Sequence, residues 1–272
     1  MQRRNLLGAG MAAAILPTSG NTQETTGSVS NRAIVLVHGA NHGGWCWVHV
    51  ATRLRAMGYR VLTPTLTGLA DRQHLRSPEI TLTTHINDIV NLIEWEELND
   101  IILVAHSYGG TVVTGVCDRM RERIARVIFI DANTPGNGQP TIPGLTPELA
   151  EKITGAPLID GYLLPALDPT RMGIDPGDQS NIDWLNRRLT PHPLQTLTEP
   201  IRLTRGGSDG MHRTFVLATP LEQLQKFAAE GTLKMKADPS WKFREFLVGH
   251  DVMIIAPNDT ADLIHEIAGT AS

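Results

Sequence analysis

Ser107 is the residue whose neighbours in the sequence are best suited to nucleophilic chemistry. It lies in Ala105-His106-Ser107-Tyr108-Gly109, and the alanine of this segment ends the apolar run IILVA. A stretch with helical periodicity follows. A serine on a sharp strand-to-helix turn needs small residues two positions before and after it, which Ala105 and Gly109 provide. The turn would lift the hydroxyl above a sheet, and the helix dipole would point at it. The sequence therefore predicts that Ser107 is a nucleophile.

A serine hydroxyl is a poor nucleophile unless a base takes its proton, and His250 is the best placed of the ten histidines. It lies far downstream of the serine, directly after a strand-like segment at residues 243–248. His106 adjoins the serine, but we expect its side chain to point away along the strand end. His250 is therefore the predicted general base.

The glycine-rich segment HGANHGGWCW follows the first apolar run and is suited to binding an oxyanion. Its backbone N–H groups can face the oxygen of a reacting carbonyl, and we expect the donors to be Ala40 and Tyr108. His38 and His42 are four residues apart, but the glycines around them argue against a helical metal-binding pair. A dinucleotide-binding turn is excluded because G-x-G-x-x-G is absent.

Strands and helices alternate around these motifs, which predicts an α/β fold with a doubly wound, mostly parallel sheet. The apolar and β-branched runs predict strands at residues 33–38, 59–66, 101–105, 127–130, 214–218 and 243–248. Helical spacing predicts helices at residues 45–57, 85–97, 108–120 and 259–267.

Residues 134 to about 212 interrupt this alternation and are rich in Pro, Gly, Asp and Thr. A segment of this length is too long for a plain connection. We expect a core of residues 31–134 and 213–272 and a mainly helical cap at residues 135–212. The acidic stretch DPGDQSNID within the cap lacks the glycine of a calcium loop, so it predicts a turn and no metal site.

The segment 1–20 has the layout of a secretory signal peptide. Arg3 and Arg4 precede an apolar stretch, and small residues follow up to Gly20. The paired arginines resemble a twin-arginine signal, so we expect export to the periplasm or beyond, with cleavage near Gly20.

Composition excludes several classes of protein. Hydrophobic residues make up 41% and charged residues 19%, which is typical of a folded chain with a sizeable core. The net charge is 24 − 28 = −4, and no basic patch stands out, so no nucleic-acid partner is expected. Two cysteines without a C-x-x-C motif argue against a disulfide framework. No apolar run reaches the length of a membrane-spanning helix, so no stable membrane anchor is expected.

The segments HGANHGGWCW, VAHSYGG and GHDVM resemble one branch of the α/β-hydrolases. That branch contains plant methyl esterases, hydroxynitrile lyases and bacterial aryl and alkyl esterases. The resemblance covers nearly all of residues 33–268, and LTPTLTGLADR and RLTPHPL are most similar to the bacterial esterases. It implies an α/β-hydrolase fold and a serine hydrolase with Ser107 as nucleophile and His250 as base. It also implies no cofactor and, as substrate, a small carboxylic ester such as an aryl or methyl ester.

The residue that would orient His250 is left open between two acids. Plant members of the branch carry an aspartate after the strand that matches residues 214–218, but here that place reads TPLE. Glu222 lies roughly there. Asp131 ends the run VIFI beside the nucleophile strand, a position that some α/β-hydrolases use. We favour Asp131, although it could simply cap a turn, and Glu222 could be an ordinary first-turn acid of a helix.

Two other functions remain to be weighed. Hydroxynitrile lyases of this branch carry Thr after the strand-end histidine and Lys after the catalytic histidine, whereas here those positions are Gly39 and Asp251. Both departures disfavour cyanohydrin cleavage. A non-catalytic binding protein on the same fold is disfavoured by the Ser–His pair and the intact glycine-rich loop.

The candidates for an apolar substrate pocket are Trp45, Trp47, Tyr108, Leu164 and Trp184.

Overall fold

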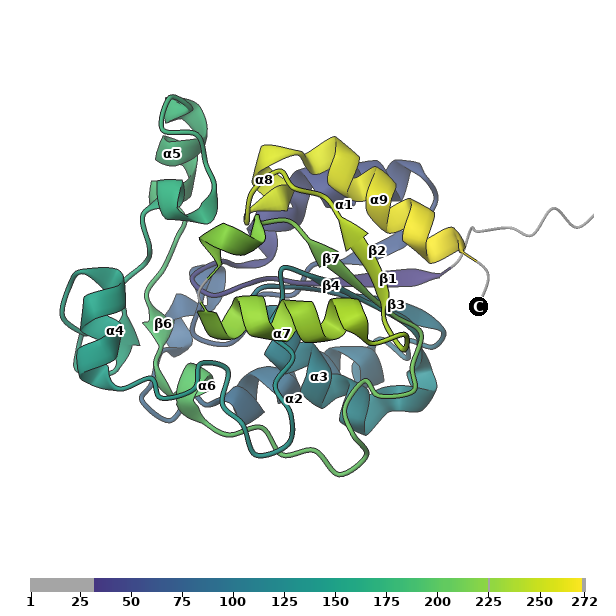
Figure 1. Ribbon diagram of the computed structural model, residues 1–272, viewed down its shortest axis with the longest axis horizontal. Coiled ribbons are helices and arrows are strands. Elements are labelled where there is room, and N and C mark those ends of the chain that lie inside the picture. Colours follow the sequence, from purple (N-terminus) through teal and green to yellow (C-terminus); the bar gives the residue numbers. More distant parts are fainter. Residues whose placement is uncertain (1–31, 225, 271–272) are drawn as a thin grey trace, which may run out of the picture.

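The computed structural model describes residues 32–224 and 226–270, so the predicted signal segment 1–20 lies outside the described residues. Its centre is a six-stranded sheet in the order β2-β1-β3-β4-β7-β8 (Figure 1). All five neighbouring pairs are parallel. The strands are β1 (Ala33–Val37), β2 (Arg60–Leu62), β3 (Ile101–His106), β4 (Ile124–Ile130), β7 (Arg213–Leu217) and β8 (Lys242–Glu245). The predicted parallel, doubly wound α/β fold is confirmed.

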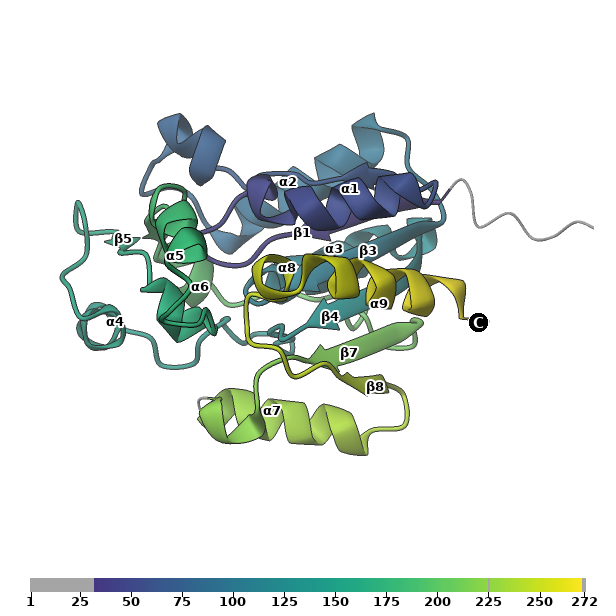
Figure 2. The same cartoon turned by 90° about the horizontal axis from the view of Figure 1, so that it is seen from above.

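Helices cover both faces of the sheet, as its continuous apolar strands require. On one face lie α1 (Val48–Ala56) and α9 (Pro257–Gly269); on the other lie α2 (Leu82–Trp95), α3 (Gly109–Met120) and α7 (Lys226–Ala237) (Figures 1 and 2). Successive residues of β1 face opposite sides, so Ile34 packs in the cluster under α1 and Val35 in the cluster under α2. The sheet therefore has a hydrophobic core on each side.

The short helices and strands of the segment 134–212 lie beyond the carboxyl ends of the strands of the main sheet, on the side where Ser107 follows β3 (Figure 2). The end of the segment returns along α3 towards the start of β7, where the backbone of Thr204, Arg205 and Gly207 bonds to Asp118. The segment contains short helices and a two-stranded antiparallel sheet. These elements are α4 (Pro147–Thr154), β5 (Leu163–Leu164), α5 (Gln179–Asn186), β6 (His192–Pro193) and α6 (Gln195–Thr198). Ligands of open α/β sheets bind outside this edge, so the segment covers the region where a site is expected.

The structure corrects several predicted boundaries. The strand predicted at residues 59–66 ends at Leu62, and Pro64, which has no N–H for a ladder, follows it closely. The strand predicted at residues 243–248 ends at Glu245. The helix predicted from residue 45 opens as a 3₁₀ turn, Gly44–Trp47, before α1. Helix α7 was not predicted, because its apolar residues do not form one clear stripe.

The remaining short elements connect the larger ones. Short 3₁₀ turns occur at Ala70–Leu75, Arg121–Arg123, Pro169–Met172 and Leu221–Gln223, and α8 (Val252–Ile255) precedes α9. Among the residues that the structure describes, none of the helices combines the length and apolar character needed to cross a bilayer.

Candidate active site

Ser107 lies on a tight turn between β3 and α3, as predicted for a nucleophile. Its φ is +53°, a left-handed conformation that non-glycine residues rarely adopt. The turn depends on the glycines that open α3, because a Cβ on Gly109 would lie 2.7 Å from the His38 carbonyl oxygen. A Cβ on Gly110 would lie 2.4 Å from the Asn133 carbonyl oxygen. Close approach of α3 to two loops therefore requires glycine at both positions.

His250 lies between Ser107 and Asp131 in a chain of hydrogen bonds. Its Nε2 is 3.0 Å from Ser107 Oγ, and its Nδ1 is 3.2 Å from Asp131 Oδ2. A carboxylate only accepts, so Nδ1 carries the hydrogen and Nε2 is free to accept from the serine hydroxyl. The Asp131 side chain is 1% exposed and that of His250 is 28% exposed. The arrangement has the geometry of a nucleophile, a base and an orienting acid.

The electrostatic surroundings favour a charged Asp131 and a basic His250. Burial alone would lower the pKa of His250, but the hydrogen bond and charge of Asp131 raise it above its ordinary value. Burial alone would raise the pKa of Asp131, but His250 and two further donors lower it. These donors are the Ala218 N–H, at 2.6 Å from Asp131 Oδ1, and the Thr219 hydroxyl. The carboxylate can therefore stabilise a protonated His250.

Of the two candidate acids, Asp131 is the one that contacts His250. Asp131 follows β4, which pairs with the nucleophile strand β3. Its φ is +44°, and its backbone N–H donates to the Val216 carbonyl oxygen. Glu222 lies on an exposed 3₁₀ turn after β7. Geometry therefore favours Asp131 for the orienting role, which remains a prediction.

The glycine-rich loop after β1 lies against the nucleophile turn. A Cβ on Gly39 would be 2.9 Å from both Ser107 Cβ and His106 Nδ1, so only glycine fits there. Within residues 32–224 and 226–270, the N–H groups of Ala40 and Tyr108 make no hydrogen bond. Free backbone donors beside a nucleophile are what an oxyanion hole requires.

His42 and Asp251 form a buried pair beside this loop that the sequence did not predict. His42 Nε2 lies 3.2 Å from Asp251 Oδ2, and the two side chains are 2% and 0% exposed. Burial alone would lower the pKa of His42, but the charge and hydrogen bond of Asp251 raise it. Burial alone would raise the pKa of Asp251, but His42 lowers it. Each partner therefore favours the charged form of the other.

His106 does not point away from the site, and that expectation was wrong. Its ring lies 4.6 Å from the ring of His250, and its Nε2 is 2.9 Å from the His250 carbonyl oxygen. The side chain is 1% exposed, and burial lowers its pKa to about 3. His106 is therefore a neutral donor that holds the backbone of His250.

A second buried network holds Tyr108, the other expected oxyanion residue. The Tyr108 hydroxyl is 2.8 Å from His85 Nδ1, and His85 Nε2 is 2.8 Å from the Thr67 carbonyl oxygen. The carbonyl only accepts, so Nε2 carries a hydrogen. Burial lowers the pKa of His85 to about 4, so the ring is neutral and Nδ1 accepts from the tyrosine hydroxyl. The ring of His192 packs edge-on against Tyr108 at 4.8 Å. Tyr108 is therefore held from two sides.

The five candidates for an apolar pocket differ in burial. Trp47 and Tyr108 are buried in the core, and Leu164 is also buried. Trp45 and Trp184 are partly exposed and meet edge-on at 4.9 Å. Their contact joins the glycine-rich loop to α5, and of the five candidates these two are the ones that are not buried.

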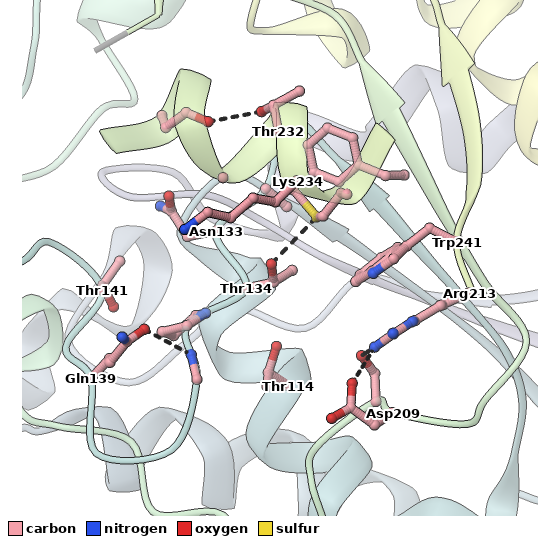
Figure 3. A pocket seen from close by; sticks show the side chains of 18 of the residues that line it. Thr114, Asn133, Thr134, Gln139, Thr141, Asp209, Arg213, Thr232, Lys234 and Trp241 are labelled. Atoms are coloured by element: carbon pink, nitrogen blue, oxygen red, sulfur yellow. Dashed lines mark hydrogen bonds and ion pairs between the residues drawn. The ribbon is translucent and has the colours of Figure 1, made fainter. Parts of the chain in front are cut away.

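A cavity adjoins the site on the side of Asp131 (Figure 3). Its volume is about 860 Å³, and it lies between α7, β7 and the segment that follows β4. Asp131 and Asn133 line one end, and Arg213 stacks on Trp241 at the other. Neither Ser107 nor His250 is among the described residues that line it. The cavity therefore lies beside the hydrogen-bonded chain and not over the serine.

One group of described residues has ligand atoms close enough to hold a metal ion. His106, His250 and Asp251 bring one such atom each within 4.8 Å of one another. His250 already bonds to Ser107 and Asp131, and Asp251 to His42. These residues therefore belong to the hydrogen-bonded network of the site.

Comparison with known proteins identifies the family of the chain. Residues 34–263 match the model of the alpha/beta hydrolase family. A carbendazim hydrolyzing esterase of Nocardioides sp. (strain SG-4G) is 40% identical over 240 residues, which cover 84% of this chain and 96% of that protein. Methyl jasmonate esterase 1 of Vitis vinifera is 36% identical over 110 residues, 39% of this chain and 41% of its own length.

Among solved structures, an extracellular alpha/beta-hydrolase from a Paenibacillus species superposes with a TM-score of 0.74 at 21% identity. The match covers 88% of this chain and 100% of that one, which shows a shared fold. With the family match over most of the chain and an esterase at 40% identity, the chain belongs to the alpha/beta hydrolase family and is a carboxylic ester hydrolase.

Proposed function

We propose that this protein is a serine esterase that cleaves small carboxylic esters through an acyl-enzyme intermediate. The observation that carries the proposal is the chain of hydrogen bonds from Ser107 through His250 to Asp131. His250 Nε2 takes the Ser107 proton while Oγ attacks the ester carbonyl carbon. The N–H groups of Ala40 and Tyr108 bind the oxygen that becomes negative, and one such donor contributes roughly 2.7–4 kcal/mol.

The intermediate then collapses and the alcohol leaves with the proton from His250, so that the acyl group stays on Ser107 Oγ. Water enters, gives a proton to His250 and attacks the acyl carbon. The bond between the acyl carbon and Ser107 Oγ then breaks, His250 returns the proton to Oγ, and the carboxylic acid is released. Throughout, Asp131 keeps the Nδ1 hydrogen in place and stabilises the imidazolium. No step needs a metal or a cofactor.

Methyl and aryl esters are the proposed substrates. The relatives support this class, since a carbendazim hydrolyzing esterase and a methyl jasmonate esterase are among them. Cyanohydrin cleavage is disfavoured, because Gly39 has no room for the side chain that the lyases carry there. In addition, Asp251 places a buried carboxylate where the lyases carry a lysine.

The experiment is a panel of 4-nitrophenyl acetate, phenyl acetate, methyl benzoate, carbendazim and the cyanohydrin mandelonitrile. We expect wild-type protein to hydrolyse esters in the panel and Ser107→Ala to lose the activity while its thermal unfolding stays the same. Residual turnover in Ser107→Ala close to wild type would refute the serine mechanism. Release of benzaldehyde from mandelonitrile with no ester cleavage would favour the lyase instead.

A further inference from the structure

The buried His42–Asp251 pair takes no part in the proton transfers just described, yet it contacts the loop that carries the oxyanion donor. His42 Nδ1 lies 2.7 Å from the Ala40 carbonyl oxygen, and Nε2 lies 3.2 Å from Asp251 Oδ2. The carbonyl only accepts, so Nδ1 carries a hydrogen and a second proton lies between Nε2 and Oδ2. His42 is therefore fixed at both ring nitrogens.

The peptide group between Ala40 and Asn41 is held at both of its polar atoms. His42 Nδ1 donates to the Ala40 carbonyl oxygen, and the Asn41 N–H donates to His192 Nδ1 at 3.3 Å. Asn41 has a φ of +65°, in the left-handed region that non-glycine residues adopt only when their surroundings impose it. His42, His192 and Thr190, which bonds to the Asn41 side chain and carbonyl oxygen, supply that constraint. The Ala40 N–H belongs to the preceding peptide, whose Gly39 oxygen lies 2.8 Å from His38 Nδ1. The backbone is therefore held on both sides of Ala40, and the His42 contact fixes the side that leads to Asn41.

Asp251 connects this constraint to the base. It follows His250 directly in the sequence, and its own N–H donates to the Met172 carbonyl oxygen at 3.0 Å. The side chain that fixes His42 thus belongs to the segment that carries the general base. A buried ion pair is a weak source of stability, since apolar residues of similar volume often serve as well. The pair is better explained by the geometry that it imposes.

We propose that Asp251 and His42 are positioning residues that hold the Ala40 N–H in the direction required by the oxyanion. This inference rests on the proposed serine esterase function and deepens it. The pair acts mainly through its hydrogen bonds and only secondarily through its charge.

Three variants of the full chain separate these roles. Asp251→Asn removes the charge, but its amide can donate to the Nε2 of a neutral His42, which still donates to Ala40. The double variant His42→Phe/Asp251→Leu keeps apolar packing, leaves no unpaired charge and removes both hydrogen bonds. His42→Gln keeps a donor that faces Asp251 but loses the donor to Ala40, and it serves as the test if the double variant does not fold.

The measurements are kcat and KM for 4-nitrophenyl acetate, normalised to active sites counted with diethyl 4-nitrophenyl phosphate. We expect kcat of the double variant and of His42→Gln to fall by about a hundredfold, the usual loss for one oxyanion donor, with little change in KM. Inhibition by a phenyl-substituted trifluoromethyl ketone, whose adduct carries the oxyanion, should weaken in parallel. Asp251→Asn should keep most of the wild-type kcat.

A matched control is Asp118→Asn, outside the site. Asp118 is also a buried aspartate, and it accepts hydrogen bonds from the backbone of Thr204, Arg205 and Gly207. Its loss should lower the unfolding temperature and leave kcat per active site unchanged. The positioning role is overturned if the double variant and His42→Gln keep the wild-type kcat, or if Asp251→Asn loses as much as they do. Failure of the phosphate reagent to label Ser107 in wild type would instead refute the serine esterase.

Discussion

Ser107 and Asp131 share a conformation that explains how two neighbouring strands present a nucleophile and an acid. Both follow the last residue of a parallel strand, β3 or β4, and both have positive φ, +53° and +44°. Such turns redirect the side chain out of the alternating pattern of the strand. His250 can therefore bridge the two, although it lies 143 residues after Ser107. Backbone strain at these positions is stored where the chemistry is proposed.

Kinetics of two variants can distinguish Asp131 from Glu222 as the acid that orients His250. Asp131→Asn should reduce kcat by about four orders of magnitude, because the amide can stabilise the wrong tautomer of His250. Glu222→Gln should leave kcat close to wild type, since Glu222 is exposed and contacts neither partner. Steady-state kinetics on 4-nitrophenyl acetate measures both. A larger loss in Glu222→Gln than in Asp131→Asn would reverse the assignment.

The pH profile supplies an independent readout of the same contact. The base must be neutral to accept the Ser107 proton, so kcat/KM should rise with pH as His250 loses its proton. Because Asp131 raises the pKa of His250, the midpoint should lie above the ordinary histidine value of about 6.5. In Asp131→Asn the midpoint should move to lower pH. An unchanged midpoint would show that Asp131 does not act on the imidazole.

The sequence predicted the proximity of Ser107 and His250 better than the contacts of the residues around them. Ser107, His250 and the glycine-rich loop are local patterns, so the sequence could identify them without a structure. The His42–Asp251 contact joins residues 209 positions apart, and nothing local marks it except that Asp251 directly follows the base. His106 was misjudged because strand alternation does not show that the segment carrying His250 returns over it.

At the scale of elements, close packing of α3 fixes the nucleophile turn. Helix α3 is almost entirely buried, and its first two glycines touch the carbonyl oxygens of loops after β1 and β4. The Asn133 N–H also donates to the Ser107 carbonyl oxygen at 3.1 Å. Any displacement of the helix start therefore moves the serine and the segment that follows Asp131 together.

A substitution at Gly110 tests this packing. In Gly110→Ala the new Cβ would lie 2.4 Å from a backbone oxygen that cannot rotate away. We expect a loss of about 1–3 kcal/mol in the free energy of unfolding, measured by chemical denaturation. Gly231→Ala in α7 is the control, because a Cβ there meets nothing within 4 Å. That change should stabilise by about 0.5–1 kcal/mol. Equal stability of the two variants would contradict the packing argument.

Elements with one clear signal were predicted, and those that depend on tertiary context were not. The β-branched runs of β1 and β3 are buried on both faces and could be recognised from the sequence alone. Strand β8 lies at the edge of the sheet and is largely exposed, so its end depends on pairing with β7 and not on composition. The same holds for α7, which contains a glycine and has a weak apolar stripe.

At the scale of the whole molecule, the segment 134–212 is tied to the proposed oxyanion loop. The Asn41 side chain donates to the Thr190 carbonyl oxygen at 2.8 Å, and the Thr190 N–H donates to the Asn41 carbonyl oxygen at 2.9 Å. His192 completes the contact at the Asn41 N–H. The segment predicted as a cap from its length therefore also contributes to the architecture of the site beneath it.

The predicted signal segment, residues 1–20, precedes the folded part of the chain. The first strand begins at Ala33, so removal of residues 1–20 would leave every described element intact. We propose a twin-arginine route, which carries folded protein, and the free, buried thiols of Cys46 and Cys117 need no oxidising compartment to fold. Cleavage would also remove Arg3 and Arg4 and change the net charge to 22 − 28 = −6.

N-terminal sequencing of protein from the periplasm or medium of its native host should find a start near residue 21. The variant Arg3→Lys/Arg4→Lys should leave uncleaved precursor inside the cell, because the paired arginines are what the route recognises. Ester hydrolysis by the retained precursor serves as the control, since the change lies outside the fold and should not affect the site. Uncleaved wild-type chain confined to the cytoplasm would refute export, and export of the lysine variant at the wild-type rate would point to a general secretory route.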